Sequence, residues 1–159
     1  LHFTPAMMEA LKGRGMETVS VTLHVGPGTF APVRVQDYTR HRLEPEYFEL
    51  SEDTAARLNQ ARAQGKRLAA VGTTSVRVLE YCASPQGFTA RQAWCDLYLY
   101  PGYRFKAVDK LLTNFHLPKS TLLLLVSAFA GRDFILRAYE EAIREKYRFY
   151  SYGDCMLII

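Results

Sequence analysis

The sequence predicts an α/β fold, a layered domain in which helices cover a largely parallel or mixed sheet. Two observations indicate this class. Short β-branched or apolar segments that suit strands alternate along the chain with segments whose apolar residues recur at helical spacing. Gly and Pro stand at many of the boundaries between these segments. The 159 residues suffice for one domain, and the apolar content of 48% is ordinary for a globular protein.

Helix caps and strand-like alternation delimit the elements in the first part of the chain. Thr4 followed by Pro5 is a typical helix start, and Ser51 followed by two acidic residues is a second one. Glycines close both helices. The predicted elements are a helix over 6–12, a strand over 17–25, a loop over 26–33, an extended segment within 41–50 and a helix from the Ser51 cap to Gln64.

In the second part of the chain, strands and helices alternate more regularly. An apolar strand leads into the tight turn GTTS, and a proline opens a helix rich in leucine. Phe134, Ala138, Ala142 and Ile143 have the spacing of the apolar face of a helix. The predicted elements are a strand over 67–71, a turn over 72–75, a helix over 76–83, a strand over 95–100, a segment over 105–112 that fits either type, helices over 118–130 and 133–146, and strands over 147–152 and 156–159.

Charge and cysteine content exclude several protein classes. The formal charge of +4 is mildly basic and compatible with a polyanionic partner, but no block of consecutive Lys or Arg forms a basic tail. The three cysteines are odd in number and far apart, without a C-x-x-C pair. This pattern is not typical of a disulfide framework or a zinc knuckle, and it favours reduced cysteines in a cytosolic protein.

The two ends of the chain predict a protein that is not self-contained. It begins on Leu-His-Phe and ends on Met-Leu-Ile-Ile, which read as cuts through structured material rather than as solvated tails. The start does not have the pattern of a signal peptide. The longest apolar stretch, 122–130, is far shorter than the roughly 20 residues of a membrane span.

The segment GTTS (72–75) lies between a predicted strand and a predicted helix. Its backbone N–H groups and hydroxyls converge on the positive end of that helix, which suits a phosphate or carboxylate. Plain capping of the helix explains the same residues, and taken alone it is the simpler interpretation. The spacing of a nucleotide P-loop and its lysine are missing. Arg77, one turn further, could face the same anion or be a solvated charge.

The segment HVGPGTF (24–30) follows a predicted strand but lacks the third glycine of a dinucleotide fingerprint. It leaves His24 at a carboxyl strand end, where α/β sheets usually bind ligands, although such a histidine more often serves packing. The four histidines are isolated from one another and show no metal-ligand spacing. No G-x-S-x-G elbow indicates a serine nucleophile.

The segment TNFHLPKST (113–121) gathers the densest set of polar and titratable side chains in the chain. If Pro118 occupies the first helical position, Asn114 and His116 precede the helix and Lys119 and Ser120 lie in its first turn. A capped helix with incidental polar neighbours is the alternative. Because four such groups stand directly before a run of leucines, we interpret the segment as part of a functional site.

Two further segments combine aromatic residues with charge. YPGYRFK (100–106) interleaves tyrosines with basic residues, a pattern that can stack on bases and hold phosphates, or can form a turn with half-buried tyrosines. YRFYSYGD (147–154) is similar and ends on Asp154. That aspartate is a candidate base or hydroxyl binder, and it is equally typical of a turn.

Taken together, five segments resemble the C-terminal half of the bacterial S-adenosylmethionine:tRNA ribosyltransferase-isomerase family of the queuosine pathway. They are LHFTP (1–5), TLHVGPGTFAPV (22–33), VGTTSVRVLE (71–80), YPGYRFKAVDKLLTNFHLPKSTLLLLVSAFAG (100–131) and YRFYSYGDCMLI (147–158). The resemblance covers nearly the whole chain, and its longest segment is highly specific. Family members are about twice as long and carry an inserted β-barrel domain before the Leu-His-Phe segment. The resemblance therefore implies that residues 1–159 are the C-terminal part of a large α/β catalytic domain, without its N-terminal part and its inserted domain.

The chain departs from the family pattern at few positions. The family usually has H-x-M-H-x-E where residues 41–46 read HRLEPE, so Glu44 replaces the second histidine. Pro27, Leu124 and Cys155 stand where Leu, Met and Ala are common, and they are interpreted as packing variations.

The resemblance implies a reaction as well as a fold. The family transfers and isomerises the ribosyl part of S-adenosylmethionine onto 7-aminomethyl-7-deazaguanine in the tRNA anticodon loop, which gives epoxyqueuosine and releases adenine and methionine. The implied co-substrate is S-adenosylmethionine, with no prosthetic group and no metal. The implied protein is cytoplasmic, is monomeric at full length and binds no membrane, and the chain alone is expected to be inactive.

The same resemblance implies roles for named residues. His116, His24 and Asp154 are the candidates for proton transfer, and Asp154 can instead bind ribose hydroxyls. The candidates for binding S-adenosylmethionine are His2, Gly26, Gly28, Thr29, Gly72, Thr73, Thr74, Ser75, Arg77 and Asn114, of which residues 72–75 with Arg77 would hold the methionine carboxylate or a tRNA phosphate. The candidates for binding tRNA are Tyr100, Tyr103, Arg104, Lys106 and Lys119.

Two other function classes fit parts of the sequence. The basic pI and the Tyr/Arg segments would also suit a non-catalytic RNA-binding module, which would bind tRNA without binding S-adenosylmethionine. An unrelated α/β hydrolase or transferase is disfavoured because the chain has neither a nucleophile elbow nor a P-loop.

Overall fold

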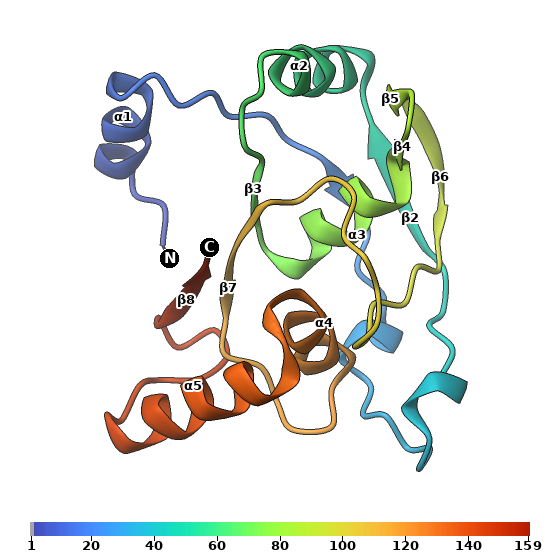
Figure 1. Ribbon diagram of the computed structural model, residues 1–159, viewed down its shortest axis with the longest axis vertical. Helices are drawn as coiled ribbons and strands as arrows, with labels where there is room; N and C mark the ends of the chain where they lie inside the picture. Colours follow the sequence, from blue (N-terminus) through green and yellow to red (C-terminus); the bar gives the residue numbers. More distant parts are fainter. Residues whose placement is uncertain (1) are drawn as a thin grey trace.

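The computed structural model describes residues 2–159, with only the backbone described at Phe30 (Figure 1). The elements are α1 (Pro5–Gly13), β1 (Thr22–Leu23), the 3-10 turns η1 (Pro27–Phe30) and η2 (Tyr38–Arg40), β2 (Glu46–Leu50), α2 (Glu52–Ala63), β3 (Ala69–Val71), α3 (Thr73–Cys82), β4 (Ala83–Ser84), β5 (Gly87–Phe88), β6 (Arg91–Cys95), β7 (Lys110–Asn114), α4 (Thr121–Ala130), α5 (Arg132–Arg144) and β8 (Cys155–Ile158).

Strands of the described chain form two three-stranded sheets and one short hairpin. The order β1-β2-β6 is antiparallel throughout, while in β3-β7-β8 the pair β3–β7 is parallel and β7–β8 is antiparallel. The α/β class is confirmed, and of the two predicted arrangements the mixed sheet is the one observed. The long connection that begins with α3 carries the chain back to the end of the sheet at which β3 starts. β7 can therefore run parallel to β3.

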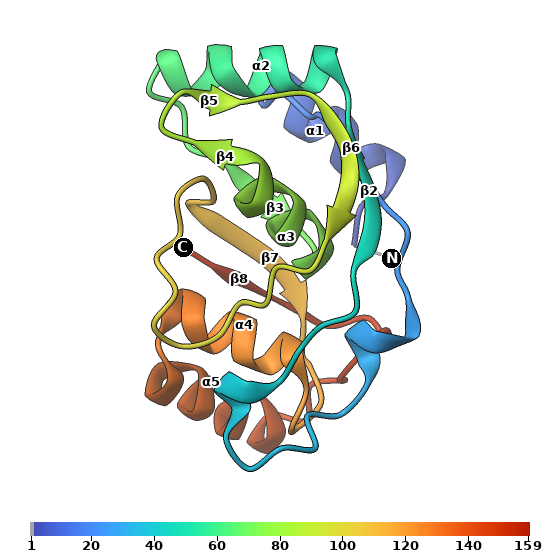
Figure 2. The same cartoon turned by 90° about the vertical axis from the view of Figure 1, so that its right-hand side faces the viewer.

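Helix α3 lies between the two sheets and is the most deeply buried helix (Figures 1 and 2). Its Val76 and Val78 are fully buried, as are Phe48 of β2 and Leu111 of β7, which belong to the same core. α4 and α5 lie side by side below the second sheet in both views (Figures 1 and 2). In contrast, α1 has no buried residue and stands apart from the sheets (Figure 1).

Several predicted boundaries are confirmed by the caps that the structure shows. Thr4 accepts a hydrogen bond from the Met7 amide at the start of α1, and Ser51 accepts one from Thr54 at the start of α2. These local signals predicted both helices to within a residue or two. The extended segment predicted within 41–50 is β2, and residues 105–112 contain the start of β7.

Three strand predictions were too long, displaced or wrong. Only Thr22–Leu23 of the predicted strand 17–25 pairs with β2, at an edge of the sheet. The strand predicted over 95–100 lies instead at 91–95, where five residues pair with β2. Residues 147–152 form turns, with Tyr150 at φ 60°, and do not form a strand. These predictions came from alternating apolar residues in the sequence. A strand also requires a hydrogen-bonded partner, which the alternation alone does not indicate.

Two helix predictions changed at their N-terminal ends, and a third changed in the residues that it buries. α3 begins directly at Thr73, so the predicted turn 72–75 is reduced to Gly72 as N-cap. α4 begins at Thr121 with Ser120 as its cap, so Pro118 is not in the helix and Lys119 is not in its first turn. The buried residues of α5 are Ile135, Tyr139 and Ala142. Of the predicted apolar face only Ala142 is therefore buried, and Phe134 and Ile143 are exposed. No helix among residues 2–159 is long and apolar enough to cross a membrane.

Candidate functional site

A cavity of about 500 Å³ lies at the carboxyl ends of the parallel strands β3 and β7. This is the position at which open α/β sheets usually bind ligands, because the backbone groups at the strand ends point into the crevice. The wall residues come from five segments of the chain. They are His2, Thr29, Val71, Gly72, Thr73, Thr74, Leu112, Thr113, Asn114, Phe115, His116, Leu117, Ser120, Leu122, Tyr150 and Ser151.

One wall of the cavity is the N-terminal end of α3. Gly72 has φ 86°, a conformation that favours glycine, and its amide donates to the carbonyl of Leu112 at 2.8 Å. This bond ties the start of α3 to β7. The first amides of a helix have no partner within the helix, and they carry the positive end of its dipole. Thr73 and Thr74 line the cavity and add two hydroxyls that can bind a ligand.

The cavity wall also contains His116, which is 8% exposed. Its Nε2 lies 3.1 Å from the Thr113 hydroxyl, and its backbone amide donates to the Tyr139 hydroxyl at 2.7 Å. Burial lowers the pKa of His116 to about 4, and it raises the pKa of Tyr139 to about 12. At neutral pH the imidazole is therefore uncharged and present in its basic form.

A polar pair closes one side of the cavity. Nε2 of His2 lies 2.9 Å from Oδ1 of Asn114, so residues 112 positions apart in the chain meet in the wall. Ser120 lines the cavity as well, but its hydroxyl donates to the Leu117 carbonyl at 2.7 Å and accepts from the Leu123 amide. Ser120 is thus a helix cap whose hydrogen bonds are already made.

Thr29 of η1 is part of the cavity wall. A buried ion pair forms hydrogen bonds to this turn. Glu46 and Arg77 form an ion pair whose side chains are 3% and 4% exposed. The Glu46 carboxylate accepts hydrogen bonds from the Gly26 amide and the Thr29 hydroxyl, both at 2.7 Å. Arg77 therefore does not line the cavity and does not face an anion at the start of α3.

The glycines of the same loop lie close to acidic side chains. A Cβ at Gly28 would lie 3.3 Å from Glu44, and one at Gly26 would lie 3.7 Å from Glu46. Gly28 therefore leaves room for Glu44, the residue that departs from the family pattern. Neither glycine lines the cavity, and Ser75 also does not, because its hydroxyl turns back to the Val71 carbonyl at 2.8 Å.

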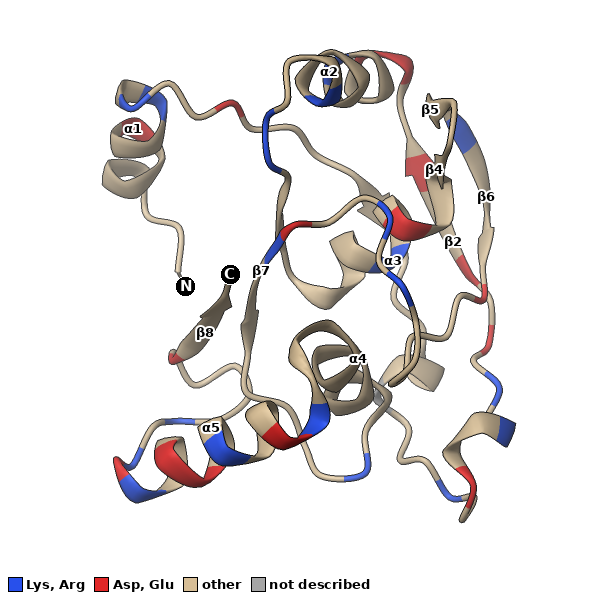
Figure 3. Cartoon of the chain, in the orientation of Figure 1, with Lys and Arg blue, Asp and Glu red and all other residues tan. Residues whose placement is uncertain are grey.

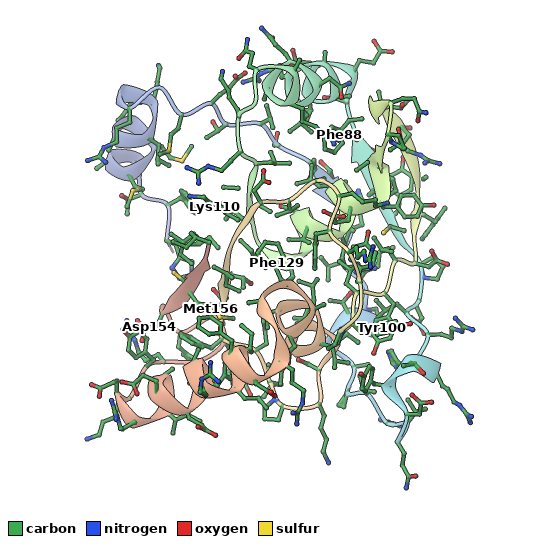
Figure 4. All side chains as sticks on the ribbon, in the orientation of Figure 1. Phe88, Tyr100, Lys110, Phe129, Asp154 and Met156 are labelled. Atoms are coloured by element: carbon green, nitrogen blue, oxygen red, sulfur yellow. The ribbon has the colours of Figure 1, made fainter. Side chains whose placement is uncertain are left out.

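Two of the three candidates for proton transfer lie outside the cavity wall. His24 is exposed at the end of β1, with its ring 5.6 Å from that of Tyr47. Asp154 accepts three hydrogen bonds from Arg148, which lower the pKa of this carboxyl to about 2. Asp154 precedes β8, near α5 in Figure 4.

The candidates for tRNA contact lie outside the cavity too. Tyr100 packs against Tyr38 and Tyr98, with ring centroids 5.8 and 5.0 Å apart, on the far side of the molecule from Asp154 in Figure 4. The Tyr103 hydroxyl donates to Glu80 at 3.1 Å, and the Lys106 ammonium donates to the Ala83 carbonyl at 3.4 Å. Arg104 and Lys119 are exposed.

The structure thus brings seven predicted residues together around one cavity. They are His2, Thr29, Gly72, Thr73, Thr74, Asn114 and His116. Sequence reasoning missed the apolar part of the wall and the buried carboxylate of Glu46. A signal for Glu46 was available, because alternation in EYFEL places it on the same face as Phe48 and Leu50. No group of three metal-binding side chains was found among residues 2–159.

Comparisons with known proteins agree on one family. The family model described as "Queuosine biosynthesis protein" matches residues 1–158. Proteins named S-adenosylmethionine:tRNA ribosyltransferase-isomerase are 54% identical in Macrococcus caseolyticus, 56% in Symbiobacterium thermophilum and 56% in Moorella thermoacetica. The matches cover 99–100% of this chain and 47% of each relative. The chain thus spans about half the length of these relatives.

A solved structure shows the same fold. The crystal structure of S-adenosylmethionine tRNA ribosyltransferase from Thermotoga maritima is 43% identical to this chain and superimposes with a TM-score of 0.82. The superposition covers 99% of this chain and 50% of the other.

Proposed function

The chain belongs to the queuosine biosynthesis protein family, and on that premise we propose that it provides the C-terminal part of an S-adenosylmethionine:tRNA ribosyltransferase-isomerase. The proposed reaction transfers and isomerises the ribosyl group of S-adenosylmethionine onto 7-aminomethyl-7-deazaguanine in the anticodon loop of tRNA. Its products are epoxyqueuosine in tRNA, adenine and methionine. The proposal places a monomeric protein in the cytoplasm, with a further half that includes the inserted domain.

The observation that carries this proposal is the mixed lining of the cavity. Its polar lining includes the N-terminal end of α3 and the hydroxyls of Thr73 and Thr74, which suit a carboxylate such as that of the methionine part. Its apolar lining includes Phe115, Leu117 and Tyr150, which suit a flat base. A volume of about 500 Å³ lies within the range of small-molecule sites.

Within this site we assign proton transfer to His116, because it alone of the three candidates lines the cavity. The reaction needs a base, since the sulfonium of S-adenosylmethionine makes protons on the neighbouring ribose carbon acidic. The uncharged imidazole is already in the form that accepts a proton. The Thr113 hydroxyl would orient the ring through Nε2.

For tRNA we propose contacts through exposed basic side chains outside the cavity. Arg104 and Lys119 are exposed and belong to different connections of the fold, and Figure 3 shows blue basic segments in both connections. They would contact phosphates, which makes binding depend on salt. Tyr100 remains a proposed stacking residue, whereas the polar ends of Tyr103 and Lys106 are already bound within the protein.

Adenine release from S-adenosylmethionine in the presence of tRNA bearing the deazaguanine tests the proposal. It should be measured for this chain and for the chain joined to the remaining half of the Moorella relative. In the joined protein, His116→Ala should lower the rate about 100-fold with nearly unchanged binding of S-adenosylmethionine, because a positioned base is lost. His24→Ala is the matched control outside the cavity, and it should keep the rate within about twofold.

Two outcomes would contradict the proposal. Near-normal turnover of His116→Ala would refute the assigned base. If the joined protein binds tRNA but not S-adenosylmethionine, the non-catalytic RNA-binding alternative holds instead.

A further inference from the structure

We propose that Glu46 and Arg77 form a buried clamp that holds two walls of the cavity in a fixed relation, the η1 wall with Thr29 and the N-terminal end of α3. Both are positioning residues, since neither lines the cavity. The inference rests on the proposed function only in taking this cavity as the binding site for S-adenosylmethionine.

On the first side of the clamp, the buried carboxylate of Glu46 binds the η1 loop. One carboxylate oxygen, Oε1, accepts from the Gly26 amide and from the Thr29 hydroxyl, each at 2.7 Å. The other oxygen, Oε2, is bonded to Arg77. The start of the loop is therefore organised around a single carboxylate that belongs to β2, a strand outside the cavity.

The Arg77 side of the clamp ties the same loop to α3 and to the first sheet. Nη1 also donates to the Thr29 hydroxyl at 3.0 Å, so that hydroxyl accepts from Arg77 while it donates to Glu46. Nε and Nη2 donate to the carbonyls of Leu97 and Cys95, both at 3.2 Å. Arg77 lies in α3 four residues after Thr73, so these bonds connect the N-terminal part of that helix to the η1 loop.

A third hydrogen bond of Thr29 connects the clamp to α4. The Thr121 hydroxyl donates to the Thr29 carbonyl at 3.1 Å. Thr29 is thus bonded to β2 and α3 through its side chain and to α4 through its backbone. Because these bonds are directional and the charged groups are shielded from water, the clamp defines one position of Thr29, whereas an apolar contact would tolerate several.

Hydrogen exchange of the backbone amides tests the clamp without any ligand. In Glu46→Gln, the Gln amide cannot supply both acceptor oxygens, so exchange over 26–33 and 71–76 should rise about tenfold, while 52–63 should stay near its wild-type rate. Glu17→Gln is the control, since it removes an exposed ion pair with Arg57 away from the cavity. A purely structural role would raise exchange everywhere or nowhere, and either result would overturn the inference.

Binding of S-adenosylmethionine, measured by calorimetry on the same chain and on the joined protein, tests the consequence for the site. Thr29→Val loses both hydrogen bonds of the hydroxyl and should weaken the binding of S-adenosylmethionine about tenfold. Thr29→Ser keeps both bonds and should bind with the affinity of the wild type. Equal affinities for the wild type and Thr29→Val would overturn the positioning role. If the wild type does not bind, the proposed function fails, and hydrogen exchange in Thr29→Val against Thr29→Ser still decides the clamp.

Discussion

At the scale of single residues, the surroundings of His116 determine its charge. The imidazole is enclosed by the cavity wall, where water cannot solvate a positive charge, and this burial lowers its pKa from 6.5 to about 4. A histidine that remains neutral at physiological pH can accept a proton but does not act as an imidazolium donor. The same property makes His116 a pH-sensitive contributor to stability.

We expect the folded chain to lose stability as the pH falls from about 6.5 to about 4. In this window the unfolded chain binds a proton at residue 116 and the folded chain does not, so protonation favours unfolding. This difference in pKa corresponds to on the order of 3 kcal/mol in the free energy of unfolding. The contribution is fully present above pH 6.5 and is lost as the pH falls to about 4. Urea unfolding at several pH values would show a flatter profile for His116→Gln.

The control for this experiment is His24→Gln, which changes an exposed histidine. Its profile should follow that of the wild type. The lowered pKa of Asp154 adds a loss of stability with its midpoint at a lower pH, between its ordinary value and about 2. Identical profiles for the wild type and His116→Gln would show that His116 is not held neutral by the fold.

At the scale of elements, a second buried carboxylate organises the connection from β6 to β7. Glu80 of α3 is fully buried and accepts hydrogen bonds from the amides of Lys106, Ala107 and Val108 at 2.8–3.0 Å. It also accepts from the Tyr103 hydroxyl, and burial together with the negative charge of Glu80 raises the pKa of Tyr103. One side chain of α3 therefore shapes the loop that carries Arg104.

We expect Glu80→Gln to lower the free energy of unfolding by about 3 kcal/mol, because the Gln NH₂ group would face amide donors that now meet a carboxylate oxygen. Denaturation in urea measures this change. Glu140→Gln on the exposed side of α5 is the matched control and should cost less than about 0.5 kcal/mol. A cost for Glu80→Gln as small as that of the control would mean that the loop does not depend on the carboxylate.

At the scale of the whole molecule, the chain exposes more surface than its mass requires. Its accessible area is 10257 Å², whereas a compact protein of 18.1 kDa exposes roughly 8,100 Å². Part of the excess adjoins the cavity. Val71, Leu112 and Leu157 are aligned across β3, β7 and β8, and Val71 and Leu157 are 48% and 60% exposed. We expect the further half found in the relatives to cover this row.

Leu157→Lys tests that expectation. In the chain alone the substitution should change the free energy of unfolding by less than about 0.5 kcal/mol, because the side chain is exposed. In the chain joined to the remaining half of the Moorella relative it should cost about 2 kcal/mol or more, since a charge would then be buried. An equally small effect in both proteins would mean that this row stays open to solvent.

The sequence by itself determined the α/β class, the two helices that Thr4 and Ser51 cap, and the family. Caps and helical spacing are local, so a short stretch of residues contains the whole signal. The residues around GTTS and TNFHLPKST were also predicted as a site from their own chemistry, and most of them line the cavity.

Only the tertiary structure decided which candidates meet. Arg77 and Glu46 lie 31 positions apart, and nothing local to either one indicates that they pair and turn Arg77 away from the cavity. The shift of the strand from 95–100 to 91–95 has the same origin, because strand limits depend on hydrogen bonds to a distant partner. Pairing, burial and the pKa of His116 arise from contacts between distant segments, and these exist only once the chain has folded.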